Sequence, residues 1–394
     1  MKDVFARSLA LHAELKGKMS AELKAPLENQ EDLSLMYSPG VAQPCREIAA
    51  NPESVYDYTW KGNTVAVVTN GTAILGLGDL GPEAALPVME GKCALFKRFG
   101  GVNAVPVLVD SKDPEEIIRI VKAISPTYGG INLEDIKAPE CITIEQTLLR
   151  ECNIPIFHDD QHGTAIVTTA AVINALKLVK KNAEDCNVVI SGVGAAGSSI
   201  IRMLKRIGIA NFYGYNSKGI LNRKDADSYT NPLYRELAQI TNKDAEDLSI
   251  EEAMKKADIF IGVSVPNKID KAMVRSMRRD PIVFAMANPD PEIPYDDARE
   301  AGARVVGTGR SDYPNQVNNV LAFPGLFKGA LQVHATEINE EMKLAAAYAL
   351  ANLVPEEKLS EEYVIPGPFE TGVADAVAKE VAAIAVKMGV VRAK

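Results

Sequence analysis

The chain has 394 residues, which is enough for two domains of ordinary size, and its 47% hydrophobic and 24% charged residues are typical of a globular protein. A formal net charge of −9 argues against nucleic acid or an anionic membrane surface as the main partner. No run reaches the ~20 consecutive apolar residues of a transmembrane helix, so we expect no membrane span.

The N-terminal segment is predicted to be helical as far as about residue 30. It is mixed in charge and has no apolar stretch long enough for a signal peptide. The five cysteines are scattered and show no CxxC spacing, which favours reduced, mostly buried thiols and argues against a structural zinc site. Both observations predict a cytoplasmic protein.

The sequence around Tyr37 and around Lys92 indicates how far each side chain is buried. Tyr37 stands directly before a Ser-Pro-Gly turn, where residue type alone favours a half-buried loop tyrosine. Lys92 lies on a helix that Pro82 is predicted to begin, and its neighbours are small or apolar. We therefore expect Lys92 to be partly buried.

Short apolar runs alternate with polar segments and helices in the first part of the chain, which predicts a parallel α/β unit. The predicted strands cover residues 64–69, 104–109, 131–133 and about 154–157. Helices are predicted over residues 114–124 and 140–150, and a long helix over residues 166–181.

Four acidic residues directly follow two of these runs: Glu134, Asp135, Asp159 and Asp160. In a parallel sheet, ligands bind beyond the carboxyl ends of the strands. Carboxylates crowded at one edge repel one another unless a cation offsets them, and oxygen ligands suit Mg²⁺ or Mn²⁺. The alternative is that these residues are helix caps and loop acids. The pattern alone does not decide between the two.

The spacing GxGxxG occurs twice. The first copy, at Gly76, has no carboxylate about 20 residues further on, so its glycines are expected to form turns in a loop. The second copy directly follows the apolar run 187–190 and opens an amphipathic helix, which is the arrangement that holds a dinucleotide pyrophosphate. Its glycines are Gly192, Gly194 and Gly197.

The next predicted strand, residues 210–215, ends at Asn216, where a carboxylate would bind the ribose of NAD. Asparagine does not repel a 2′-phosphate, and Ser217 and Lys218 follow, so both NAD and NADP stay open.

Three further apolar runs continue a doubly wound sheet, and they put polar residues along the same crevice. The runs cover residues 258–263, 282–287 and 303–307 and end near Ser264, Asn288 and Thr308. In a later loop, Asn318 and Asn319 could bind a carboxylate or form a plain turn. An alanine-rich helix is expected over residues 335–351.

Nine segments together resemble the malic enzymes, in the shorter form found in bacteria. They occur in the family order and cover most of residues 35 to 330. They are YSPGVA at 37, NGTAILGLGDLG at 70, EGKCALF at 90, NLEDI at 132, FHDDQHGTA at 157, GVGAAG at 192, NSKG at 216, FAMANPD at 284 and NNVLAFPG at 318.

The resemblance implies an N-terminal α/β malic domain at residues 1–160 and a doubly wound, Rossmann-type NAD(P)-binding domain with C-terminal helices at residues 161–394. It implies oxidative decarboxylation of L-malate to pyruvate and CO₂ with NAD or NADP and with Mg²⁺ or Mn²⁺. It also implies a homodimer or a higher homo-oligomer.

The resemblance also implies residue roles. Lys92 is similar to the family's general base and Tyr37 to its general acid. Asn288 and Asn319 are similar to residues that contact substrate or the nicotinamide end. The metal ligands it implies are Glu134, Asp135 and Asp160, with Asp159 beside them. The pyrophosphate loop it implies consists of Gly192, Gly194, Ala195, Ala196 and Gly197.

The chain departs from the family pattern at Ala73, where the larger eukaryotic enzymes have an arginine. Asn216 leaves the choice between NAD and NADP open. His158 and His162 are expected to be hydrogen-bonded neighbours of the site rather than catalytic groups. Two alternatives remain. One is a malolactic-type reaction that releases lactate from nearly the same residues. The other is a dinucleotide-binding sensor, which would have no need for a base, an acid and a metal site together.

Overall fold

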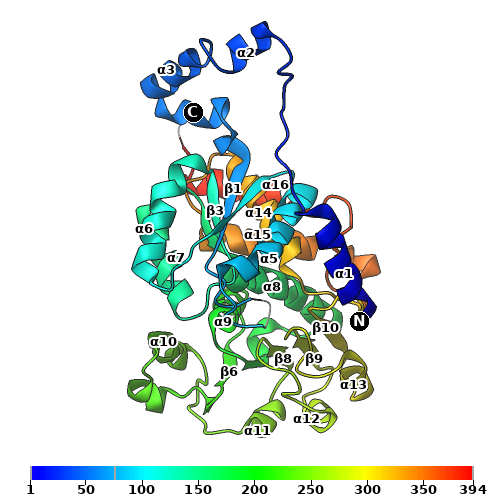
Figure 1. Ribbon diagram of the computed structural model, residues 1–394. Helices are drawn as coiled ribbons and strands as arrows, with labels where there is room; N and C mark the ends of the chain where they lie inside the picture. The colour runs from blue at the N-terminus through cyan, green and yellow to red at the C-terminus, as the bar shows by residue number, and fades with distance from the viewer. Residues whose placement is uncertain (1, 75–76, 393–394) are drawn as a thin grey trace.

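The computed structural model describes residues 2–74 and 77–392, and it contains two parallel sheets with a long helix between them (Figure 1). The first sheet has the order β2-β1-β3-β4, and all its neighbouring strands are parallel. Its strands are β1 Thr64–Thr69, β2 Asn103–Leu108, β3 Gly130–Leu133 and β4 Ile156–His158. The strands lie within a residue or two of their predicted positions.

The alternating side chains of β1 pack into different layers. Ala66 and Val68 pack with the residues of two amphipathic helices, α6 Pro114–Ile124 and α7 Glu140–Glu151. Val65 and Val67 belong to the central core, together with residues of α5 Pro82–Leu95. Proline at the first position of α5 and of α6 suits its fixed φ, and both helices begin where the sequence predicts.

The second sheet has the order β10-β9-β8-β5-β6-β7 and is parallel except for β7. Its strands are β5 Asn187–Ser191, β6 Asn211–Asn216, β7 Gly219–Ile220, β8 Ile259–Gly262, β9 Ile282–Ala285 and β10 Val305–Thr308. Because the chain leaves β5 toward β6 and later returns on the other side at β8, the sheet is doubly wound as predicted, with its switch point between β5 and β8.

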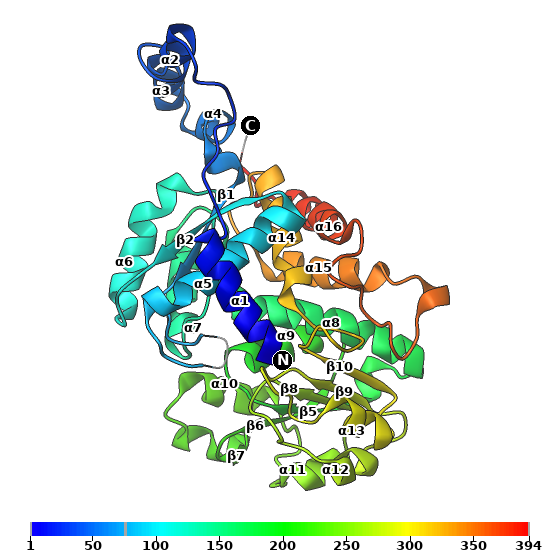
Figure 2. The same ribbon diagram turned by 45° about the vertical axis from the view of Figure 1, so that its right-hand side comes forward.

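Helices cover the second sheet on both faces (Figure 2). They are α9 Ala195–Arg206, α10 Pro232–Ile240, α11 Ile250–Met254, α12 Lys271–Ser276 and α13 Tyr295–Glu300. A capping box of Ser249 and Glu252 begins α11.

The long helix α8, Asp159–Val179, begins directly after β4 and packs against α9 and α15. Its length and composition would allow it to span a membrane, but most of its apolar segment is buried inside the molecule, as in a core helix. The prediction that this helix begins at residue 166 is wrong, because Asp159 and Asp160 already form its first turn.

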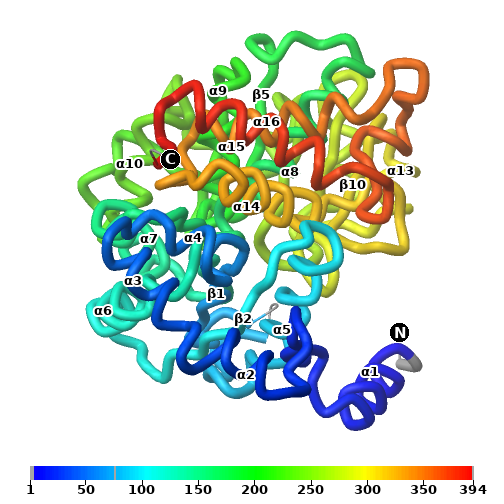
Figure 3. The backbone as a smooth tube through the Cα atoms, turned by 90° about the horizontal axis from the view of Figure 1, so that it is seen from above, coloured from blue at the N-terminus to red at the C-terminus, as the bar shows by residue number. Residues whose placement is uncertain are grey.

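Three C-terminal helices run side by side across the molecule (Figure 3). They are α14 Phe323–Gln332, α15 Glu340–Asn352 and α16 Val373–Met388. Helix α14 packs beside the first sheet, where the Phe323 ring is tilted and the Phe327 ring edge-on to the ring of Phe96, at centroid distances of 4.6 and 5.4 Å. The C-terminal segment therefore contributes to the core of both sheets, and the domain boundary at residue 160 stays a prediction.

The N-terminal residues form an arm, whose first helix lies beside the body and whose following helices stand away from it (Figures 1 and 2). Its helices are α1 Lys2–Leu15, α2 Gln30–Met36, α3 Ala42–Ala50 and α4 Val55–Tyr58. The prediction of a helix to residue 30 is wrong, because α1 ends at Leu15 and Gly17 has a φ of +121°, which favours glycine. Neither α2 nor α3 contains a buried residue.

The five cysteines are free, and Cys93, Cys141 and Cys186 are buried, in agreement with the prediction. Cys45, on the arm, is exposed.

Candidate active site

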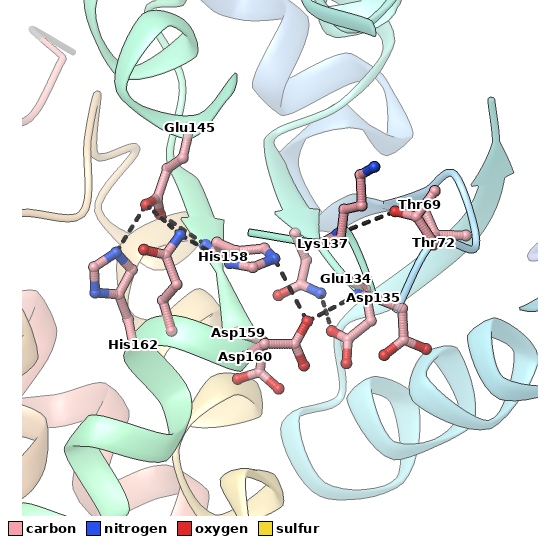
Figure 4. Close-up of polar contacts among 12 residues, drawn as sticks. Thr69, Thr72, Glu134, Asp135, Lys137, Glu145, His158, Asp159, Asp160 and His162 are labelled. Carbon is pink, nitrogen blue, oxygen red and sulfur yellow. Dashed lines mark hydrogen bonds and ion pairs between the residues drawn. The ribbon is translucent and has the colours of Figure 1, made fainter. Parts of the chain in front are cut away.

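Three carboxylates converge at the carboxyl edge of the first sheet. Glu134 and Asp135 follow β3, and Asp160 lies in the first turn of α8 just after β4. Since β3 and β4 are neighbouring parallel strands, these ends meet, and one oxygen from each of the three residues lies within 4.8 Å of the others (Figure 4). Such a cluster offers oxygen ligands alone, which suits a hard divalent cation.

Lys92 reaches this cluster from the last turn of α5. Its Nζ lies 2.8 Å from Glu134 Oε1 and 2.6 Å from Asp159 Oδ2. The ammonium also lies over the ring of Phe323, 4.4 Å from its centroid. The predicted partial burial is confirmed, since the side chain is 10% exposed.

The carboxylates determine the protonation of Lys92. Burial by itself lowers the pKa of the ammonium, but Asp159 and Glu134 outweigh burial and raise the pKa above its ordinary value. A cation bound to the neighbouring acids would oppose this effect.

Asp159 joins Lys92 to the C-terminal half of the chain. Its Oδ2 accepts a hydrogen bond of 2.6 Å from Asn319 Nδ2 in addition to the one from Lys92. The side chain is fully buried, and Gly163 leaves room for it, since a Cβ there would lie 1.9 Å from Asp159 Oδ1. Asp159 thus holds the lysine, while the other three acids form the cluster.

A cleft of about 890 Å³ connects the cluster to the second sheet. Ala73, Lys92 and Asn319 line one part of it, and Ser264 and Asn288 line the part beyond β8 and β9. Ala195 and Ala196 of the glycine loop also face the cleft. Asn216 ends β6 at the neighbouring strand, where its Oδ1 accepts the backbone N–H of Lys218 at 2.7 Å.

The earlier GxGxxG segment lies partly outside the described residues, at Gly76. Its other two glycines, Gly78 and Gly81, have φ values of +83° and +86° in the loop before α5, as the turn prediction requires.

Two alanine variants test the predicted role of the second glycine loop in binding a dinucleotide. A Cβ on Gly197 would lie 1.9 Å from Gly192 O, whereas a Cβ on Gly194 meets no atom within 4 Å. We expect Gly197→Ala to lower the thermal unfolding midpoint, because the helix cannot approach the loop. Gly194→Ala should unfold like the wild type and bind dinucleotide more weakly, because the methyl group occupies the space for the pyrophosphate. Calorimetry and cofactor titration of both variants check this, and equal unfolding midpoints would contradict it.

Tyr37 is not brought to this site within the chain. It follows α2 on the arm and is 69% exposed, so the prediction of a half-buried tyrosine is wrong. It is not among the described residues that line the cleft, although Ser8, His12 and Lys18 of the same arm are. The exposure of Tyr37 fits its place after α2, which contains no buried residue.

Two buried carboxylates near the site escaped sequence reasoning. Glu292 accepts the backbone N–H groups of Ser264 (2.8 Å) and Ala287 (3.1 Å), and so ties together the two loops after β8 and β9. Its loop position carries no signal of burial. Glu145 does have a signal, because it lies on α7 beside the buried positions Cys141, Ile144 and Leu148.

Glu145 is the centre of a buried polar network. It accepts hydrogen bonds from His158 N, Gln161 Nε2 and His162 Nε2, at 2.9, 3.2 and 2.9 Å (Figure 4). Burial raises the pKa of Glu145, but the His162 ring and the Lys343 ammonium outweigh burial and lower it to about 2. The carboxylate is therefore ionised throughout the neutral range.

The network predicts a pH-dependent stability. Because the pKa of Glu145 is lower in the folded chain than its ordinary value, its contribution is present above about pH 5 and is lost as the pH falls toward 2. Wild type and Glu145→Gln should therefore differ less in free energy of unfolding at pH 3 than at pH 6, by about 2 kcal/mol. Urea unfolding at several pH values measures this. Glu151→Gln, on an exposed position of the same helix, is the control, and a constant difference for Glu145→Gln would refute the prediction.

Comparisons with known proteins agree with this architecture. The family model of the malic enzyme N-terminal domain matches residues 16–149, and that of the malic enzyme NAD binding domain matches residues 161–300 and 301–388. A bifunctional malic/malolactic enzyme of Bacillus subtilis is 56% identical, over 98% of this chain and 94% of its own length. An NAD-dependent malic enzyme of Geobacillus stearothermophilus is 52% identical, over 99% and 80%.

The crystal structure of a malic enzyme from Pyrococcus horikoshii superimposes with a TM-score of 0.91 at 47% identity, and the match covers 96% of this chain and 89% of that one. The match confirms the predicted fold class. The chain belongs to the malic enzyme family of NAD(P)-dependent oxidoreductases.

Proposed function

We propose that this protein converts L-malate to pyruvate and CO₂ with reduction of NAD or NADP, and that Mg²⁺ or Mn²⁺ is required. The observation that carries the proposal is the position of Lys92. It lies between Glu134 and Asp159, beside a three-carboxylate cluster, in a cleft that extends to the glycine loop. A base, a cation site and a dinucleotide loop that share one cleft fit the oxidation of a hydroxy acid.

Glu134, Asp135 and Asp160 would hold the cation, and Gly192, Gly194 and Gly197 the pyrophosphate. When bound, the cation would stabilise negative charge on the C2 oxygen, and the nicotinamide would accept the hydride from C2. Lys92 would remove the hydroxyl proton as this hydride leaves. Asn288 and Asn319 would orient the substrate, since both side chains line the cleft.

Loss of CO₂ from the resulting keto acid leaves an enolate, whose C3 needs a proton. We assign this proton to Tyr37. Because Tyr37 is exposed on the arm of its own chain, we propose a homodimer in which the arm of one copy completes the site of the other. The apolar residues that the arm exposes support this assembly: Leu23, Leu27, Leu33, Leu35, Met36 and Val41.

The second candidate is a malolactic reaction, and the name of the Bacillus subtilis relative favours keeping it. It would use the same base and the same cleft. The difference lies in whether the reduced cofactor leaves the site or returns its hydride to pyruvate. A cytoplasmic location, proposed from the free cysteines, suits either reaction.

A product assay tests the proposal. Protein is incubated with L-malate, Mn²⁺ and either NAD⁺ or NADP⁺, and reduced cofactor, pyruvate and lactate are measured. Metal-dependent reduction of one cofactor with equal pyruvate is the expected result, and it also decides the preference left open by Asn216. Lactate without net reduced cofactor would support the malolactic reaction. Cofactor binding without any product would support the sensor.

A further inference from the structure

His158 lies between the buried network and the proposed metal site. It is the last residue of β4 and is fully buried. Its Nε2 lies 3.4 Å from Oδ2 of Asp160, the same oxygen that accepts the backbone N–H of Asp135 at 2.8 Å. Figure 4 shows the ring directed toward the Asp160 carboxylate. Among the described residues, Nε2 makes no hydrogen bond.

The proton on the His158 ring can be placed from its neighbours. Gln161 Nε2 lies 3.2 Å from Glu145 Oε2, and an ionised carboxylate can only accept, so the amide nitrogen of Gln161 must face Glu145. The same nitrogen lies 2.9 Å from His158 Nδ1. With one hydrogen directed to each partner, Gln161 leaves Nδ1 of His158 as an acceptor. In a neutral ring the proton is then on Nε2, the atom that faces Asp160.

The proton on the His162 ring is placed in the same way. Lys343 of α15 is buried, and its ammonium, which can only donate, lies 3.2 Å from His162 Nδ1. His162 must therefore donate from Nε2 to Glu145, at 2.9 Å. Glu145 thus accepts from both His162 and Gln161, and Gln161 also donates to His158, so each ring needs only one proton.

We infer that His158 is a positioning residue, whose Nε2–H faces Asp160 Oδ2 at 3.4 Å and electrostatically favours the orientation of this carboxylate toward the cation, with its tautomer fixed by Gln161 and Glu145. The inference rests on the proposed metal site. A ligand carboxylate that is oriented by a neighbouring donor loses less freedom when the metal binds, and removal of such donors typically costs about 10–100-fold in metal affinity.

Mn²⁺ binding to the protein without substrate or cofactor tests the inference, with free Mn²⁺ measured by electron paramagnetic resonance. We expect His158→Leu to bind Mn²⁺ about 10–100-fold more weakly. His158→Gln, which keeps an N–H donor, should restore most of this affinity. His162→Leu removes the other ring bonded to Glu145 without a contact to Asp160, and it should bind Mn²⁺ like the wild type.

Three results would overturn the inference. One is an equal loss in His158→Leu and His162→Leu, which would indicate general loss of packing. Another is an equal loss in His158→Gln and His158→Leu. The third is a Nδ1–H tautomer for His158 in nitrogen NMR of isotope-labelled histidine, which is practical because the chain has only four histidines.

Gln161→Met keeps the ring but removes the group that fixes its tautomer, and it serves if His158→Leu does not fold. We expect a smaller loss of Mn²⁺ affinity, and unchanged affinity would overturn the role of Gln161. Failure of the wild type to bind Mn²⁺ is a separate outcome, which would remove the proposed metal site itself.

Discussion

Replacement of Lys92 by alanine is expected to reduce turnover by about a hundredfold to ten-thousandfold, the contribution of a positioned general base. The loss should appear in kcat, because the substrate hydroxyl keeps its place but has no group to take its proton. Cofactor affinity should change little, since Lys92 contacts Glu134 and Asp159 and not the glycine loop. Steady-state kinetics and a dinucleotide titration measure the two quantities.

Lys92→Arg separates the base from a purely electrostatic role. Arginine keeps the positive charge beside the acids but does not release a proton near neutral pH, so this variant should also be inactive. Lys112→Ala removes an exposed lysine that pairs with Asp79, and it should behave like the wild type. Activity in Lys92→Arg close to that of the wild type would show that the charge, and not proton transfer, matters.

Mixing two inactive variants is expected to restore activity if the arm of one copy completes the site of the other. Tyr37→Phe and Lys92→Ala should each be inactive alone. A mixed dimer then has one site with both intact residues and one site with neither. The isolated mixed dimer should therefore show about half of the wild-type activity, and an unfractionated random mixture, in which half of the dimers are mixed, about a quarter. Co-expression with two different affinity tags, followed by assay of the isolated mixed dimer, measures this.

The matched control pairs Lys92→Ala with Glu134→Gln. Both residues belong to the same site of the same chain, as their 2.8 Å contact requires. Each site of that mixed dimer contains one substituted residue, so no activity should return. If the Tyr37 and Lys92 variants also fail to complement each other, while each forms dimers, the tyrosine acts within its own chain or is not the acid.

Sequence reasoning predicted the two sheets well because parallel strands buried on both faces appear as short apolar runs. It also predicted that Glu134, Asp135 and Asp160 lie at one edge of the sheet. The rule that ligands bind beyond the carboxyl ends of parallel strands depends only on topology. It misplaced the start of α8, since acidic residues at a helix N-terminus can be assigned to the preceding loop equally well. The favourable helix dipole at that end explains why two aspartates are tolerated there.

The arm and the buried network were beyond such reasoning for different reasons. Tyr37 could not be placed because, in the proposed dimer, its surroundings depend on a second copy of the chain. The network of Glu145, His162 and Lys343 joins α7, α8 and α15, which are up to 198 positions apart in sequence, counted from Glu145 to Lys343. Polar contacts at such separations leave no periodic signal in the sequence.

Helix α8 has a consequence for how the protein unfolds. Its first turn supplies Asp159 and Asp160, and its buried body shares one continuous apolar core with β1, β5 and the C-terminal helices. Neither sheet can lose its order without exposing the same helix. Although the chain has the length of two domains, its melting should therefore be cooperative across both sheets, and partly unfolded forms that keep one half intact should be scarce.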